Sequence, residues 1–196
     1  IILNPFLDVK SKFDIQEINF QIFQNIKLNK LLEKKNIIKK INSENEIIFV
    51  PKKFSRNLID NLNLKIDLAY GRINYIKKFS ISENFFKCKG NINLLEEFPL
   101  LFFDCLAELN NKQKLLKKFS IKTKDKKEKL QINVSGNLSI LNKKINLKNI
   151  SMNDNYSSSR EDLKYFKNTF ENILFDENFI EIFNLKKIKE FITEIS

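Results

Sequence analysis

Apolar and polar residues alternate along several stretches of the chain. In the stretch 62–70 the even-numbered positions are leucine, isoleucine or tyrosine, whereas the odd-numbered ones are Asn63, Lys65, Asp67 and Ala69. The stretches 86–94 and 130–140 repeat this pattern, and shorter candidates lie at 47–50 and 144–152. Since successive side chains of a strand point to opposite faces, each stretch predicts a strand with one apolar and one wetted face. The stretch 13–23 fits with a parity slip at 16–17, which predicts a β-bulge.

The three glycines of the chain share one local pattern. Gly71, Gly90 and Gly136 are each followed by a polar residue, Ile or Leu, a small polar residue and two apolar or aromatic residues. Glycine inside an alternating run is typical of a bulge, a bend or a close backbone approach. The pattern predicts one β-structural unit used several times. A strand-start preference shared by three hairpins through chance is the alternative.

Helical periodicity appears in two places. The stretch 28–41 predicts an imperfect amphipathic helix, irregular near Asn36. After the serine-rich stretch 156–159, Ser159 and Asp162 form a capping-box-like start, and a further helix is expected to begin at Asn184. We expect the first tail helix to pack onto the sheet through one apolar stripe: Leu163, Phe166, Phe170, Ile173 and Leu174. The chain is thus predicted to be one domain, with a β region at 1–156 containing the helical interlude and a helical tail at 157–196.

The two cysteines are predicted to face each other. If the strands 86–95 and 100–109 are joined by a turn centred on Glu96-Glu97, Cys88 lies directly opposite Cys105 on the apolar face. We expect the pair to be close, and bridged only if the Cα atoms come within about 7 Å. Two unrelated buried cysteines, each acting as a small hydrophobic residue, are the alternative.

Composition argues against most catalytic chemistry. The chain has 196 residues, a net charge of +11 and no histidine, which removes Ser-His and Cys-His nucleophile pairs and histidine metal sites. No phosphate-binding glycine loop is present, and two cysteines alone cannot hold zinc. The positive charge is almost all lysine and is scattered, which argues against DNA or RNA binding. A spread-out basic surface favours anionic lipid headgroups over a neutral membrane. We therefore expect no enzyme activity, no catalytic residue, no metal, no cofactor and no nucleic-acid partner.

An antiparallel sheet with one apolar face must cover that face. Helices or a second sheet would give an ordinary core, whereas acyl chains would make the face a binding groove held by hydrophobic burial. Alternation alone does not distinguish the two, because an inward leucine looks the same in both.

Three runs of the sequence, 70–73, 88–102 and 134–145, resemble the C-terminal part of AsmA-like proteins, the family that includes TamB. The tail 150–195 is similar to that of alphaproteobacterial members, and the resemblance extends from about Asn57 onward. It implies a long β-sheet curled into an apolar-lined groove, an inner-membrane anchor upstream of this chain, and a role in moving phospholipid to the outer membrane or in outer-membrane assembly. The chain, which starts at Ile1, would be a fragment of such a protein.

With this resemblance, the expected fold is mainly β with a helical tail: repeated long antiparallel strands curled into an apolar-lined groove or half-barrel, with the C-terminal helices packed on it. The expected partners are phospholipid acyl chains and, for the tail helices, an envelope protein; the expected location is the periplasm, tethered to the inner membrane. A structural or scaffold module with a closed β core is the alternative. The residues expected to line the groove are Leu62, Leu64, Ile66, Leu68, Ile92, Leu94, Phe103, Ile132, Val134, Leu138 and Ile140.

Overall fold

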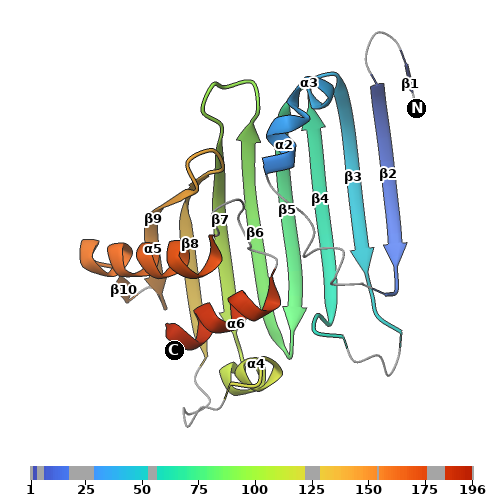
Figure 1. Cartoon of the computed structure of the whole chain (residues 1–196). Helices are drawn as coiled ribbons and strands as arrows, with labels where there is room; N and C mark the ends of the chain where they lie inside the picture. The colour runs from blue at the N-terminus through green and yellow to red at the C-terminus, as the bar shows by residue number, and fades with distance from the viewer. Residues whose placement is uncertain are drawn as a thin grey trace.

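The computed structural model of the chain describes residues 2–3, 7–17, 29–52, 57–121, 129–153, 155–175 and 184–195. Within these residues, ten strands form one sheet in sequence order, as Figure 1 shows. The sheet is open and curled, and with its C-terminal helices it confirms the expected fold class. The strands are β1 (Ile2–Leu3), β2 (Leu7–Ile15), β3 (Ile41–Phe49), β4 (Asn61–Ala69), β5 (Arg72–Ile81), β6 (Asn84–Asn93), β7 (Leu100–Leu109), β8 (Leu130–Ser139), β9 (Lys144–Met152) and β10 (Tyr156–Ser157).

One strand pair departs from the antiparallel pattern. β2 and β3 run parallel, in register from Leu7 opposite Ile41 to Ile15 opposite Phe49, whereas every other neighbouring pair is antiparallel. A parallel pair needs a crossover connection, and the two short helices α2 (Asn29–Glu33) and α3 (Lys35–Ile38) lie between β2 and β3 in the chain. β2 also begins before the predicted strand 13–23, whose second half lies outside the described residues.

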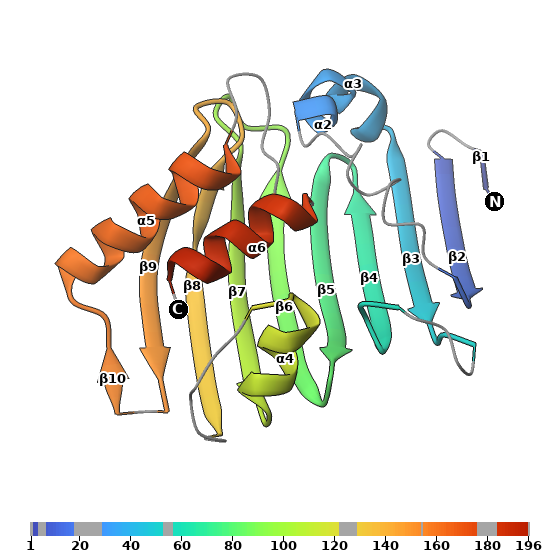
Figure 2. The same ribbon diagram turned by 60° about the horizontal axis from the view of Figure 1, so that its bottom comes forward.

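The helices gather on one face of the sheet, as Figure 2 shows for α2, α3, α4 (Lys112–Lys118), α5 (Arg160–Leu174) and α6 (Leu185–Glu194). The predicted interlude is broken at Lys34, not at Asn36. α4 was not predicted; its first turn is capped by Asn111, whose side chain accepts a hydrogen bond from the Lys114 N–H. Under the helices lie two clusters of buried residues, the first built on Ile92, Leu94, Leu138, Ile140 and Ile145, the second on Ile81, Leu109 and Leu115.

The tail begins and packs as the sequence predicts. The Ser159 side chain accepts from the Asp162 N–H, and the Asp162 carboxylate accepts from the Ser159 N–H, which completes the capping box of α5. Asn184 caps α6 in the expected position. In the predicted stripe, Leu174 is buried and Phe170 packs against the first cluster, while its ring meets that of Phe191 edge-on at 5.6 Å. α5 therefore lies on the sheet, and α6 contacts α5.

The three glycines do not all have the same role. Gly71 lies in the β4–β5 turn with φ +95°, whereas Gly90 and Gly136 lie inside strands and precede the buried turn residues Leu94 and Ile140. A Cβ added to Gly90 would lie 2.1 Å from the Phe102 carbonyl oxygen, and one added to Gly136 would lie 2.3 Å from a carbonyl oxygen of β9. The register of β8 and β9 also shifts between Ser135 and Gly136. The close approach and the bulge expected of strand glycines thus occur at the latter two positions.

Candidate functional site: the apolar face of the sheet

Cross-strand register assembles the apolar face from rows of side chains. Residues directly opposite each other in neighbouring strands share a face, so the pairings from β2 to β9 define each row across the sheet. We call the side that carries the two buried clusters the apolar face. Its central row consists of Phe13, Ile47, Leu64, Lys77, Cys88, Cys105, Val134 and Ile150.

All the predicted lining residues lie on this apolar face, but in two different environments. Ile92, Leu94, Leu138 and Ile140 are at most 4% exposed and form the closed first cluster, against which Phe103 packs. Ile132 packs against the second cluster. By contrast, Leu64, Ile66, Leu68 and Val134 are only half-buried, and Leu62 is buried. The structure thus brings the predicted set together on one face and places part of it in a filled core.

Three of the half-buried predicted residues, Leu64, Ile66 and Leu68, lie on β4, whereas Val134 lies on β8. In the central row Ile47 and Leu64 are half-buried, and Phe13 on β2 is 55% exposed. In the views of Figures 1 and 2, α4, α5 and α6 lie toward the β6–β9 side and α2 and α3 lie at one end of β4 and β5. We call the apolar face of β2–β5 the N-terminal apolar face. On this face Phe49, Leu62 and Ile81 are buried, whereas most of the other aliphatic and aromatic side chains are half-buried.

One charged residue interrupts this face. From β2 to β9, Lys77 on β5 is the only charged side chain at the strand positions that the structure assigns to the apolar face. Its Nζ lies 5.2 Å from the centroid of the Phe79 ring, within cation–π range. Burial lowers the pKa of the Lys77 ammonium. Sequence reasoning missed this residue, although the alternation Ile73, Tyr75, Lys77, Phe79 already places a lysine in the apolar phase of β5.

The predicted cysteine register is confirmed. Cys88 on β6 lies opposite Cys105 on β7, and the two form a disulfide with a Cα–Cα distance of 4.1 Å. The disulfide lies in the central row, directly beside Lys77. Both sulfurs therefore sit on the apolar face, in the middle of the sheet.

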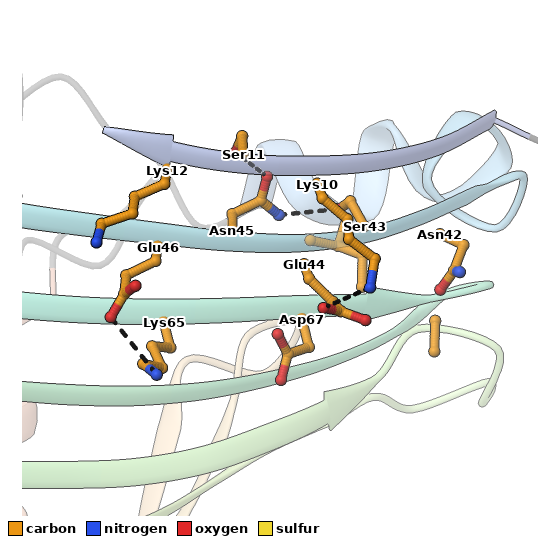
Figure 3. Close-up of a pocket in the computed structure, with 12 residues that line it drawn as sticks. Lys10, Ser11, Lys12, Asn42, Ser43, Glu44, Asn45, Glu46, Lys65 and Asp67 are labelled. Atoms are coloured by element: carbon orange, nitrogen blue, oxygen red, sulfur yellow. Dashed lines mark hydrogen bonds and ion pairs between the residues drawn. The ribbon is translucent and has the colours of Figure 1, made fainter. Parts of the chain in front are cut away.

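A depression on the sheet over β2–β4 offers different chemistry. It has a volume of about 670 Å³, and Figure 3 shows four of its charged residues in two ion pairs: Lys10 with Glu44 at 3.1 Å and Lys65 with Glu46 at 3.5 Å. A hydrogen bond from Asn63 and the charge of Lys65 lower the pKa of Glu46 despite some desolvation. These ion pairs are largely exposed and lie in register across neighbouring strands, as expected of the solvated face of a sheet. We find no reason to assign this depression a catalytic role.

Metal and membrane signatures are not found in the part of the chain that the structure describes. There, no group of three or more His, Cys, Asp or Glu side chains is placed to hold a metal ion. None of the described helices is long and apolar enough to cross a membrane.

Comparison of the chain with protein-family models, with curated proteins and with solved structures gives no match in any of the three.

Proposed function

We propose that this chain is a non-enzymatic lipid-handling protein of the cell envelope, a fragment of an AsmA-like protein that supports phospholipid transport to the outer membrane or its assembly. The observation that carries the proposal is the N-terminal apolar face. A strip of apolar side chains that remain partly exposed, such as Leu64, Ile47 and Phe13, is suited to acyl chains, because hydrophobic burial is non-directional and scales with area.

Three further features support the proposal. The long meander with one apolar side resembles the architecture implied by the sequence resemblance to AsmA-like proteins. The Cys88–Cys105 disulfide is compatible with an oxidising compartment such as the periplasm. The net charge of +11 favours an anionic membrane surface. In this proposal the inner-membrane anchor lies upstream, and the tail helices α5 and α6 are available to an envelope partner.

A closed structural module is the second candidate. The first cluster favours it, because Ile92 and Leu94 are only 2% and 1% exposed beneath the helices. In that case the helices would fill the apolar face, and the half-buried residues of β2–β5 would be the margin of a core. The two candidates differ only in what contacts the N-terminal apolar face.

Photo-crosslinking from two neighbouring positions separates these candidates. A photoreactive benzoylphenylalanine replaces either Leu64, on the apolar face, or Lys65, which points to the opposite face of the same strand. After expression in a Gram-negative envelope and irradiation, mass spectrometry of the intact protein should show phospholipid adducts from position 64 and none from position 65. Equal labelling at both positions, or none at position 64 in folded protein, would favour the closed module.

A further inference from the structure

We propose that Lys77 is an anion site for the phosphodiester of a glycerophospholipid whose acyl chain lies across β4, β3 and β2. This proposal rests on the proposed function and adds a specific head-group contact to it. The site consists of one cation set in an apolar surface, with a strip of apolar side chains leading away from it to the edge of the sheet.

Lys77 has uncharged neighbours on both adjacent strands. Its neighbours in the central row are Leu64 on β4 and the disulfide residue Cys88 on β6. Among the described residues, its ammonium lies over the Phe79 ring, and no carboxylate forms an ion pair with it. An ammonium in apolar surroundings is costly unless an opposite charge is near. A bound anion would offset that cost.

The lowered pKa of Lys77 agrees with this geometry, since its cause is burial and not a neighbouring charge. A single cation balances one negative charge. A phosphodiester carries one such charge, whereas a phosphate monoester carries nearly two at neutral pH. The charge of the site therefore favours a phosphodiester over a phosphate monoester, and the laurate probe below distinguishes a phosphodiester from a carboxylate.

The path of the acyl chain follows from the register. From Lys77 the central row continues through Leu64, Ile47 and Phe13, each on the next strand toward the N-terminal side. With neighbouring strands spaced about 4.8 Å apart, this strip extends about 14 Å from β5 to β2. β1 pairs with β2 only at Leu7 and Asp8, so in the described part of the chain Phe13 lies at the edge of the sheet.

Polar groups border the strip on one side. In the neighbouring row, the Ser11 hydroxyl donates to the Asn45 side-chain oxygen at 2.8 Å, and the Asn45 amide donates to the hydroxyl of Ser43, one row further on, at 2.9 Å. An acyl chain covering these groups would remove them from water without adding a partner. The acyl chain is therefore directed along the central row, from the sheet edge at Phe13 toward Lys77.

The test compares Lys77→Met with Lys78→Met. Lys78 is exposed on the opposite face of the same strand, so the two variants remove the same charge from opposite sides of the sheet. The probes are lauroyl lysophosphatidylglycerol, monolauroylglycerol, which has the same chain without the phosphodiester, and laurate. Each is titrated below its critical micelle concentration against the delipidated full chain by calorimetry, with thermal unfolding as a check of folding.

We expect Lys77→Met to weaken lysophosphatidylglycerol binding at least tenfold, to the level of monolauroylglycerol, and Lys78→Met to leave it within twofold of wild type. Because the removed charge is half-buried among apolar side chains, the apo Lys77→Met protein should also unfold at the same or a higher temperature than wild type. Equal affinity of Lys77→Met and wild type for the phosphodiester would overturn the anion site but leave the lipid face intact. If Lys77→Met weakened the binding of laurate but not that of lysophosphatidylglycerol, the phosphodiester assignment would be overturned. Failure of wild type to bind any probe would overturn both this inference and the proposed function.

Discussion

Asn84 and Asn111 hydrogen-bond to each other in both directions. The Asn84 side-chain amide donates to the Asn111 carbonyl oxygen at 3.1 Å, and the Asn111 N–H donates to the Asn84 side-chain oxygen at 2.9 Å. The same amide also donates to the carbonyl oxygens of Ile81 and Ser82. Asn84 is fully buried, and Asn111 caps α4, so this pair holds the helix against the β5–β6 turn.

Removal of this contact should destabilise the folded protein. In Asn84→Ala the buried Asn111 N–H loses its acceptor, whereas the Asn111 carbonyl oxygen keeps the Leu115 N–H as a donor. The carbonyl oxygens of Ile81 and Ser82 also lose the Asn84 amide, and an unsatisfied buried group costs about 1–3 kcal/mol. We expect the free energy of unfolding to fall by about 2–4 kcal/mol in urea titrations. Asn110→Ala is the matched control, since Asn110 is exposed and makes one hydrogen bond, to the Glu83 carbonyl oxygen. A cost below about 1 kcal/mol for Asn84→Ala would contradict the account.

The Cys88–Cys105 disulfide closes a loop with a sequence separation of 17 residues. Chain-entropy reasoning gives about 3 kcal/mol for a loop of this size. A reducing agent should therefore lower the unfolding free energy of the wild type by about that amount. The double variant Cys88→Ala with Cys105→Ala should already be destabilised and should not respond further to the reductant. Equal reductant sensitivity of both proteins would mean that the disulfide is not the cause.

Gly90 is expected to tolerate no side chain. The added Cβ of Gly90→Ala would meet a backbone oxygen of the neighbouring strand β7, which can move away only if the two strands separate. We expect a loss of at least about 2 kcal/mol in the free energy of unfolding. Asn91→Ala, one position along and exposed on the other face, should cost less than about 0.5 kcal/mol. A neutral Gly90→Ala would show that the strands do not approach as closely as described.

Asp162 predicts a dependence of stability on acid. Hydrogen bonds from the Tyr156 hydroxyl and then from Ser159 lower the pKa of its carboxyl group in the folded protein. Because the folded pKa is depressed, this contribution is fully present above the unfolded pKa of about 3.9 and is lost as pH falls through the folded value. The urea midpoint of wild type should exceed that of Asp162→Asn at pH 7, and the difference should shrink toward acid pH. The difference between the two midpoints at each pH cancels the effect of the other carboxylates, since both proteins contain them. A difference that stays constant with pH would contradict the assignment.

Much of the sheet could be predicted because alternation fixes the two faces of a strand before its partners are known. The turn at Glu96-Glu97 also set the register that joined Cys88 to Cys105. The parallel pairing of β2 and β3 could not be predicted, since periodicity identifies a strand but not its neighbour or its direction. α4 was missed because its seven residues are too short for a clear helical stripe.

The candidate site was predicted in part for a similar reason. Leu64 and Leu94 have the same place in an alternating pattern, yet one is half-buried and the other is in the filled core. The difference depends on where the helices lie, which the strands themselves do not encode. Lys77 was not predicted, because the alternation was assigned from apolar residues alone and a lysine in the same phase of the pattern carries no apolar signal.

The parallel pairing of β2 with β3 has a consequence for how the chain folds. Leu7 pairs with Ile41, whereas the hairpin partners Ala69 and Arg72, like Ile81 and Asn84, are close in sequence. Local contacts form early, and closing the long connection to β2 is entropically costly until a sheet exists to receive it. Pulse-labelled hydrogen exchange should therefore show amides of β4–β6 protected before those of β2, and the reverse order would contradict this. The edge strand that carries Phe13 would join after the β4–β6 hairpins. During synthesis it would remain unpaired until the later strands had emerged from the ribosome.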